Sequence, residues 1–449
     1  MPWKRSHYTH LLQLNNGDGV AYNGFSGAIV KLSAGAFRKA GELIDSIPEG
    51  EALPSSVEDE SLFKHLVAGG FVVDKEFDEL GAIEAQYQRE RQNSQFLLTI
   101  LPTFGCNLGC DYCFVGKKSG KMSRERQDRI IEFVTERFAS HSIPSMNVDW
   151  FGGEPLLALD VIEYLSKSFL QLCKRYDTPY SAQAITNGTM ISERSVEVLT
   201  KAGVDRLQIT LDGLKQMHDE RRPSKLRVIS SFEQTVFGLE RVVGKFLVRL
   251  RINVDKHNLN EAWALLDFFA ARGWLGPDKE FFPYLARISP FTDACASVAS
   301  EVCSVDDFQE MNLAWMKRLD SLGVPVAFQG LYQFPEPKMY NCGAIGSNGF
   351  IFNPNGEVHK CGLAVDDSSE AIGNIDDVLD PNHPNLKKWQ QWSPLLNPVC
   401  RGCEFLPSCL GGCPRNQMQM REVQKKENCQ YYMQHENRIL TTHLEMAGL

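Results

Sequence analysis

The sequence lacks long apolar runs and lacks an excess of positive charge. Nothing in its 449 residues resembles the roughly 20 consecutive apolar residues of a membrane-spanning helix. The N-terminal stretch MPWKRSHYTH has charge but no apolar core, so no secretory signal is expected. The formal net charge of −9 argues against a dominant nucleic-acid or anionic-membrane surface. We therefore expect a cytoplasmic protein with no nucleic-acid partner and no membrane partner.

Cysteine, by contrast, is plentiful, with 13 in the chain. In a reducing compartment these are not expected to form disulfides. Ten of them fall into two ordered sets, which favours metal binding. Cys173, Cys295 and Cys303 lie outside the sets, and burial as small hydrophobic side chains is the simplest interpretation of them.

The first set is the short loop Cys106-x3-Cys110-x2-Cys113, which follows the apolar, strand-like segment Phe96–Leu101. A [4Fe–4S] cluster normally takes four thiolates, one for each iron. Three thiolates leave one iron open, which is a feature of catalytic metal sites. A zinc site is the alternative, but structural zinc needs four protein ligands and no fourth Cys or His lies nearby.

This spacing, with aromatic Tyr112 before the last cysteine, resembles the radical S-adenosylmethionine (SAM) superfamily. The resemblance implies a [4Fe–4S] cluster whose open iron is chelated by SAM. It also implies that one electron cleaves SAM and releases a 5′-deoxyadenosyl radical. The residues do not indicate which side chain, if any, is a general base or radical relay.

Residues 94–330 alternate predicted strands with predicted helices. This alternation favours a parallel sheet covered by helices, and about six repeats favour a partial (β/α)6 TIM-like barrel in an α/β fold. Active sites of such barrels gather at the carboxyl ends of the strands. The expected strands are Gln95–Leu101, Met146–Trp150, Ser181–Thr186, Arg206–Leu211, Leu247–Val254 and Phe281–Ile288.

Polar or glycine residues recur at the ends of these strands. Glycines at a strand end let the backbone approach a ligand closely. Similar positions in the family bind SAM, and the resemblance implies this role for Gly152, Gly153, Glu154, Asn187, Thr210, Asp212, Arg251 and Asn253. An ordinary cap or turn role is the alternative for each polar residue. Arg221 or Arg222 could meet a carboxylate, whereas His218 is interpreted as structural.

The second set of cysteines lies in residues 331–449 and resembles the SPASM domain of radical SAM peptide-modifying enzymes. Its members are Cys342, Cys361, Cys400, Cys403, Cys409, Cys413 and Cys429. The resemblance implies two auxiliary [4Fe–4S] clusters, one held by Cys400, Cys403, Cys409 and Cys429 and the other by Cys342, Cys361 and Cys413. A hairpin is expected at Phe350–Lys360 and a terminal helix at Glu422–Leu444.

The trio of Cys342, Cys361 and Cys413 has no obvious fourth ligand. Cys303 or Cys295 could reach in, a non-thiol group could serve, or the iron could stay open and bind a substrate thiolate. Alternatively, both auxiliary clusters merely stabilise the fold. The three possibilities for the fourth position remain open at the level of the sequence.

Residues 1–93 form a separate N-terminal unit in this interpretation. Three strands, with a hairpin turn at Asn15–Gly19, precede helical patterns at Ala36–Ile47 and Glu60–Ala68. This order suggests a winged-helix-like, peptide-recognition module that binds a leader peptide at its sheet edge. An ordinary cap on the catalytic domain is the alternative.

The three-part layout resembles maturases of ribosomally synthesised peptides. It implies a radical SAM oxidoreductase that forms a thioether, C–C or C–O crosslink in a precursor peptide with a leader sequence. A reductant such as flavodoxin or ferredoxin would supply the electron. The first alternative is an anaerobic sulfatase-maturase-type oxidation of Cys or Ser to formylglycine. Those enzymes place an Asp directly after the cysteine equivalent to Cys361, whereas here that residue is Gly362. A non-catalytic iron–sulfur electron-transfer protein is a remote alternative.

Overall fold

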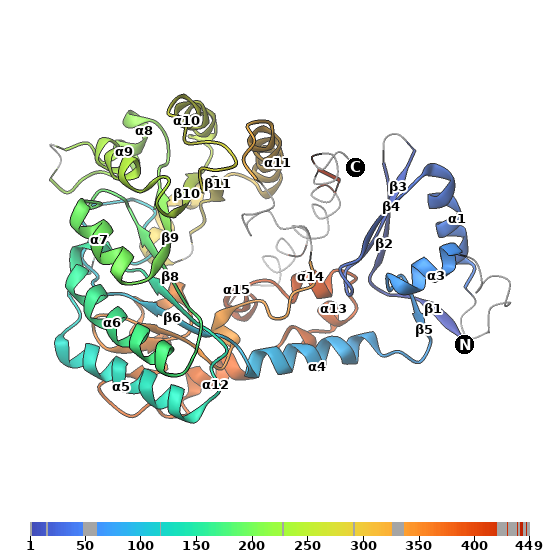
Figure 1. The fold of residues 1–449 in the computed structure, drawn as a ribbon, viewed down its shortest axis with the longest axis horizontal. Helices are drawn as coiled ribbons and strands as arrows, with labels where there is room; N and C mark the ends of the chain where they lie inside the picture. The colour runs from blue at the N-terminus through green and yellow to red at the C-terminus, as the bar shows by residue number, and fades with distance from the viewer. Residues whose placement is uncertain are drawn as a thin grey trace. The chain divides into compact units, whose positions relative to one another are not determined.

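The computed structural model describes residues 2–14, 17–47, 61–116, 118–226, 229–290, 292–325 and 336–419, with a few isolated positions beyond them. Contacts divide the chain into two compact units (Figure 1). Unit 1 comprises Met1–Gln92, Tyr332–Cys342 and Trp392–Leu449, and unit 2 comprises Asn93–Leu331 and Gly343–Gln391. No helix in the described part of the chain is long and apolar enough to cross a membrane.

Unit 2 is built on a nine-stranded sheet with the order β11-β10-β9-β8-β7-β6-β12-β13-β14. Its first six strands in sequence are parallel neighbours, which confirms the predicted βα alternation. They are β6 (Phe96–Ile100), β7 (Met146–Trp150), β8 (Tyr180–Thr186), β9 (Val204–Thr210), β10 (Leu247–Val254) and β11 (Phe281–Arg287).

Burial alternates along these strands. In β6, Phe96, Leu98 and Ile100 are buried and the residues between them are only partly covered, as a half-covered sheet requires. The apolar face packs on the helices, of which α5, α6 and α7 lie side by side in Figure 1. The helices of this unit are α5 (Arg124–Ser140), α6 (Leu159–Arg175), α7 (Glu193–Lys201), α8 (Lys215–Arg221), α9 (Ser231–Val242), α10 (Leu259–Ala271), α11 (Val305–Ser321) and α12 (Pro384–Gln391).

The C-terminal region does not fold as one consecutive block. Strand β12 (Gly349–Phe352) pairs in parallel with β6, and β13 (Glu357–His359) pairs antiparallel with β12, which confirms the predicted hairpin. A two-residue strand, β14 (Gly373–Asn374), completes the sheet. The predicted 331–449 segment is therefore divided, because the open edge of β6 takes part of it into unit 2.

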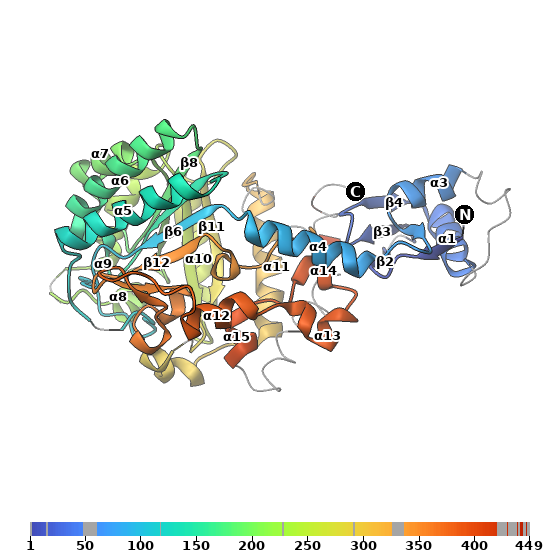
Figure 2. The ribbon, with the colours of Figure 1, turned by 90° about the horizontal axis from the view of Figure 1, so that it is seen from below.

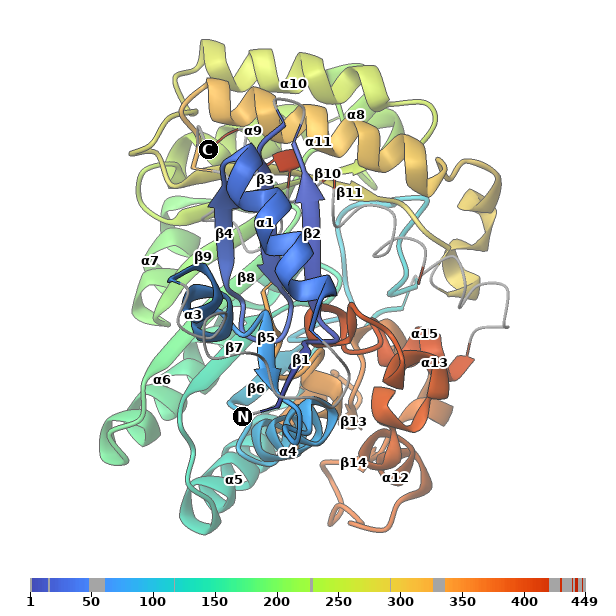
Figure 3. The same ribbon diagram turned by 90° about the vertical axis from the view of Figure 1, so that its right-hand side faces the viewer.

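The N-terminal part of unit 1 contains a three-stranded antiparallel sheet in the order β2-β3-β4. Helix α1 crosses this sheet in Figure 3. The predicted hairpin is present, whereas the small sheet of β1 and β5 was not expected. The elements are β1 (Trp3–Arg5), β2 (Thr9–Gln13), β3 (Gly19–Asn23), β4 (Ile29–Leu32), α1 (Ala34–Asp45), α3 (Ser61–Ala68), β5 (Val72–Asp74) and α4 (Glu79–Gln92).

Up to Gln419, the described cysteine-rich part of unit 1 forms short helices. They are α13 (Pro398–Arg401), α14 (Leu406–Cys409) and α15 (Pro414–Gln419). Asn341 holds the loop between the last two, because its Nδ2 donates to the carbonyls of Leu410 at 2.8 Å and Gly412 at 2.6 Å. The helix expected at Glu422–Leu444 lies almost entirely outside the described residues.

Candidate functional site

The loop with Cys106, Cys110 and Cys113 follows β6 and lies at the carboxyl ends of the parallel strands. The segment after α8 holds it by backbone hydrogen bonds. The amide of Gly109 donates to Pro223 at 2.9 Å, and the amide of Lys225 donates to Asn107 at 2.9 Å. The three cysteines are partly covered, so one short loop presents three thiols at the carboxyl end of the sheet.

Gly152 and Gly153, just after β7, pack directly on the backbone that leads to Cys106. A Cβ on Gly153 would lie 2.3 Å from the Gly105 carbonyl oxygen, and one on Gly152 would lie 2.5 Å from that of Thr103. Real Cβ atoms do not approach backbone so closely, so only glycine fits here. The glycines predicted from the sequence thus fix the base of the cysteine loop.

Glu154 is fully buried beside this contact. Its carboxylate accepts hydrogen bonds from the Leu156 amide at 3.0 Å, the Thr186 hydroxyl at 2.7 Å and the Asn187 amide at 2.7 Å. Burial raises its pKa, and these hydrogen bonds oppose the rise. Glu154 therefore ties the end of β7 to the end of β8.

Asn187 extends from the end of β8 to the cysteine loop. Its Nδ2 donates to the Asn107 Oδ1 at 2.9 Å and lies 3.8 Å from the Cys106 sulfur. The Thr189 hydroxyl accepts from Asn107 Nδ2 at 2.8 Å. The polar end of β8 therefore fixes the first turn of the loop and places an N–H donor on a candidate ligand.

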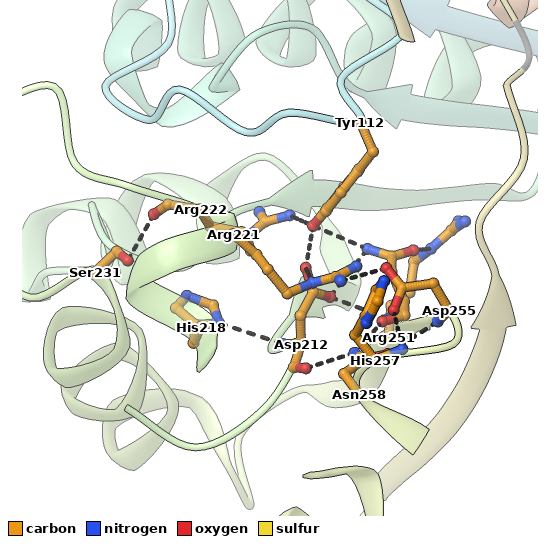
Figure 4. Close-up of polar contacts among 11 residues, drawn as sticks. Tyr112, Asp212, His218, Arg221, Arg222, Ser231, Arg251, Asp255, His257 and Asn258 are labelled. Atoms are coloured by element: carbon orange, nitrogen blue, oxygen red, sulfur yellow. Dashed lines mark hydrogen bonds and ion pairs between the residues drawn. The ribbon is translucent and has the colours of Figure 1, made fainter. Parts of the chain in front are cut away.

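Tyr112 and Asp212 form the centre of a buried polar network (Figure 4). The Tyr112 hydroxyl donates to Asp212 and accepts from Arg222 Nη1 at 2.5 Å and from Asn253 Nδ2 at 3.1 Å. Asp212 also accepts from the Asn253 amide at 3.0 Å. The Tyr112 hydroxyl, next to Cys113 in the sequence, is thus contacted by side chains that lie 100 or more positions further along the chain.

Arg221 and Arg222 bring two positive charges to this network. Arg221 pairs with Asp255 and lies 3.8 Å from the Asp212 carboxylate. Within the described residues, the Nε of Arg222 and the Nε and Nη2 of Arg221 are buried without a hydrogen-bond partner. Buried donors of this kind are normally satisfied, so the site keeps capacity for an anionic group.

The charges around the cysteines act on their acidity. Burial raises the pKa of the Cys110 thiol to about 12, and Arg222 opposes that rise. Cys106 and Cys113 each raise the pKa of Cys110 further, so the three sulfurs lie within electrostatic range of one another. Among the described residues no group of three or more His, Cys, Asp or Glu side chains is arranged to hold a single metal ion.

His218 was interpreted from the sequence as structural, and it is fully buried. Its Nδ1 accepts the Asp212 amide hydrogen at 3.2 Å. Burial lowers its pKa well below the ordinary value, helped by Arg222 and Arg221, so the ring is neutral. His218 therefore supports the backbone of Asp212.

The remaining predicted residues lie where the strands end. Thr210 closes β9 and is nearly buried. Arg251, on β10, donates from Nε to the Asn253 Oδ1 at 2.7 Å. Sequence reasoning missed the convergence of Tyr112 with Arg222 and the support of Asp212 by Asn258, whose Nδ2 donates to the Asp212 carbonyl at 2.7 Å. The paired arginines were the only signal in the sequence.

The second set of cysteines is distributed over both units. Cys400, Cys403, Cys409 and Cys429 all lie in unit 1, with Cys342 and Cys413, whereas Cys361 lies in unit 2. Burial raises the pKa of Cys400 to about 11, and the charges of Cys429 and Cys403 raise it further. Burial also raises the pKa of Cys409 to about 12, while a hydrogen bond from the Gly411 amide opposes the rise.

Cys295 and Cys303 are buried in unit 2. The sulfur of Cys295 accepts from the Thr292 amide at 3.4 Å and donates to the Thr292 carbonyl at 3.3 Å. Cys303 accepts, at its carbonyl, a hydrogen bond from Arg287 Nε at 2.8 Å. Both are thus integrated in the loop after β11.

Comparison with known proteins identifies the domain. Residues 100–269 match the model of the radical SAM superfamily. The chain is 32% identical over 164 residues to an AdoMet-dependent heme synthase of Methanosarcina barkeri, covering 35% of this chain and 42% of that enzyme. It is 25% identical over 334 residues to a cysteine-type anaerobic sulfatase-maturating enzyme of Clostridium novyi, covering 69% of this chain and 85% of that enzyme.

Two solved structures share the fold. Native anSMEcpe with bound AdoMet and Cp18Cys peptide matches with a TM-score of 0.57 and 18% identity, over 79% of this chain and all of that one. Streptococcus suis SuiB bound to its precursor peptide SuiA matches with a TM-score of 0.52 and 15% identity, over 93% of this chain and 97% of that one.

The chain therefore contains a radical SAM domain and is a radical SAM superfamily enzyme. It is homologous to the anaerobic sulfatase-maturating enzymes, and its α/β fold is shared with SPASM-type, peptide-modifying members. The family uses a [4Fe–4S] cluster and SAM.

Proposed function

We propose that the protein modifies a ribosomally synthesised peptide and forms an oxidative thioether, C–C or C–O crosslink. When bound, the cluster and SAM supply a 5′-deoxyadenosyl radical that removes hydrogen from an unactivated carbon. Cys106, Cys110 and Cys113 would hold the cluster. They fit it because one loop presents three thiols, with N–H donors of Leu108 and Asn187 on the Cys106 sulfur.

The main support for this proposal is the large share of the chain that the SuiB structure matches. The N-terminal 92 residues are about a fifth of the chain, so a match over 93% of it must include much of them. A match over 79%, as with the sulfatase maturase, leaves room for their absence. SuiB is bound to a precursor peptide, which supports a precursor peptide with a leader as the partner here.

The network beside Cys113 is the proposed SAM site. The buried, unpartnered Nε of Arg222 is suited to a carboxylate, and the buried Asn187 and Thr210 border the same strand ends. Gly152, Gly153 and Glu154 would keep the loop and strand ends in place. Asp212, Asn253 and Arg251 would orient Tyr112 and the arginines. Because the Glu154 carboxylate already accepts three hydrogen bonds, the ammonium group of SAM would contact its remaining lone pairs.

We further propose the two auxiliary [4Fe–4S] clusters of a SPASM domain. Mutual electrostatic effects among Cys400, Cys403, Cys409 and Cys429 support the first grouping. Cys342, Cys361 and Cys413 would hold the other cluster, with its fourth position unassigned. A flavodoxin or ferredoxin would act as the reductant.

The edge strand β4 is the proposed docking place for the leader peptide. Among the described strands β3 alone pairs with it, so its other edge offers unpaired backbone groups there. Ile29 and Val30 are exposed on it, which suits strand addition by a peptide with apolar side chains. Together with the helices α1 and α3, this sheet supports our proposal of a winged-helix-like, peptide-recognition unit.

Sulfatase-maturase-type oxidation is the second candidate, and the position of Asp366 favours it. A Cβ on Gly116 would lie 3.3 Å from the Asp366 Oδ2, and Lys118 donates to the Asp366 carbonyl. A carboxylate thus lies against the loop that leaves Cys113, although Gly362 follows Cys361. The sequence homology to sulfatase maturases points the same way.

A direct comparison of substrates separates the two candidates. Reconstituted protein with SAM and dithionite is incubated, without oxygen, with short peptides encoded beside its gene and with a sulfatase Cys/Ser motif peptide. We expect 5′-deoxyadenosine and loss of a pair of hydrogens in an adjacent-gene peptide. Formylglycine in the sulfatase peptide would reverse the ranking, and absence of 5′-deoxyadenosine under every condition would contradict both.

A further inference from the structure

The strands of unit 1 contact the cysteine loop of the same unit directly. His10, on β2, stacks on Phe405 with ring centroids 4.8 Å apart and an interplanar angle of 29°. Two residues away from Phe405 is Cys403, one of the four thiols proposed to hold an auxiliary cluster. Figure 2 shows α14, which begins just after Phe405, beside β2.

Two further contacts extend this interface. His7 Nε2 lies 3.2 Å from the carbonyl oxygen of Gly402. Tyr8 is buried, and burial followed by the charges of Glu79 and Cys403 raises its pKa. The segment His7–His10 therefore packs along the segment Gly402–Phe405.

The contact extends to β3, the central strand of the sheet. His10 lies opposite Tyr22 on β3, and the two rings stack with centroids 5.6 Å apart. The opposite face of the sheet packs on α1 and α3 through Leu11 and Ala21. Every residue of β3 is consequently buried, although a small three-stranded sheet would commonly leave one face in water.

The cysteine loop buries Phe405, Leu406 and Leu410, but it has no long element of regular structure. It contains only short helices, and Leu410, Gly411 and Gly412 all adopt positive φ between Cys409 and Cys413. Ligand sites formed by such segments rarely keep their shape without the metal, so metal binding and local folding are linked. If iron binding fixes the conformation of this loop, the stacked rings of Phe405, His10 and Tyr22 connect that loop to β2 and restrict the strand as well.

We propose that loading of the cluster at Cys400, Cys403, Cys409 and Cys429 orders the sheet β2-β3-β4, and that His10 is the positioning residue that couples them. The inference rests on the auxiliary cluster of the proposed function. Its consequence is that the chain presents the β4 edge to a peptide in ordered form only after iron loading. By linkage, a peptide bound at that edge favours retention of the cluster.

Hydrogen exchange of the whole chain tests the coupling without any peptide. Iron-loaded wild type is compared with Cys403→Ser and with chelator-treated wild type. We expect amides of Thr9–Gln13 and Gly19–Asn23 to exchange at least about tenfold faster without the cluster, while Met146–Trp150 stays protected. Cys106→Ala, which removes only the proposed SAM cluster in unit 2, is the matched control and leaves β2 and β3 protected.

Variants of His10 distinguish coupling from simple loss of packing. In His10→Ala the two strands exchange fast even with iron present, and chelation adds little, because the connection is already broken. His10→Phe keeps a stacking ring and restores the dependence on iron. A chelation effect of wild-type size in His10→Ala would overturn the inference.

Iron content distinguishes a wrong assignment of the auxiliary cluster from a wrong coupling. If Cys403→Ser binds as much iron per chain as wild type, the cluster assignment in the proposed function is wrong, and the coupling falls with it. If iron content falls but β2 and β3 keep their protection, the cluster stands and the coupling is wrong.

Discussion

The two cysteine loops of this enzyme are held in opposite ways. In unit 2, polar side chains surround Cys106–Cys113: an amide of Asn187, the carboxylate of Asp212 and the guanidinium of Arg222. In unit 1, the His10 ring stacks on Phe405 of the loop Cys400–Cys413, and the Asn341 amide donates to two backbone carbonyls of that loop. The first environment retains unpartnered cationic donors, as a ligand-binding site does, whereas the second resembles a folding interface.

Removing a ligand thiol from the unit 2 loop is expected to have the largest effect. Cys106→Ala should reduce 5′-deoxyadenosine formation to background, because the family's chemistry depends on the cluster at this motif. The measurement is product formation per chain, with iron content and hydrogen exchange of unit 1 measured in parallel. Cys173→Ala, at a buried cysteine against Met146, is the control; equal losses in both variants would contradict a special role for the loop.

Asp212→Asn tests whether the polar network is as important as its burial suggests. Asp212 is fully buried and close to Arg221, so removing its charge leaves a buried cation underpaired. We expect the free energy of unfolding to fall by about 3 kcal/mol and 5′-deoxyadenosine formation to fall as well. Asp205→Asn, which removes an exposed pair with Arg206, should be nearly silent in urea unfolding.

Gly153→Ala tests the rigid base of the same loop. The new Cβ would meet backbone oxygens of Gly105 and Phe104, which cannot move as a flexible side chain would. We expect a loss of about 1–3 kcal/mol in thermal or urea unfolding and weaker iron retention by unit 2. Gly35→Ala on α1 is the control, because a Cβ there meets no atom within 4 Å. Unchanged stability of Gly153→Ala would show that the loop can shift freely.

His218→Gln should have the smallest effect on product formation, and its distinctive result is a change in the dependence of stability on pH. The pKa of His218 is lowered in the folded chain, so the unfolded chain takes up the proton first as pH falls. Stability from this residue is complete above about pH 6.5 and is lost as the pH falls toward the folded pKa. Urea unfolding at about pH 7.5 and pH 5.5 should therefore differ less in His218→Gln than in wild type. His141→Gln, at an exposed position, should keep the wild-type difference.

Local patterns in the sequence were sufficient for much of unit 2. Alternating strands and helices gave the six parallel strands, and the glycines after Trp150 gave the close approach to the cysteine loop. Both depend on a few neighbouring residues. The strands β1 and β5 were missed because each has three residues and pairs across most of the N-terminal unit.

The candidate site was only partly predictable for a related reason. The sequence named Asp212 and Asn253 as single residues, but their shared partner is the Tyr112 hydroxyl, 100 or more positions away. Such a partner depends on which strand ends are neighbours in the sheet. No local pattern around Tyr112 carries that information.

By itself, the sequence determined the kind of chemistry, because ligand cysteines at fixed short spacings lie on one loop in any fold. It also determined the strands, since burial on one face leaves a periodic pattern. Only the tertiary structure decided that residues after Trp392 join the N-terminal strands rather than the catalytic sheet. It also decided that Arg222 meets Tyr112, because such contacts arise from packing between distant segments, which no local spacing encodes.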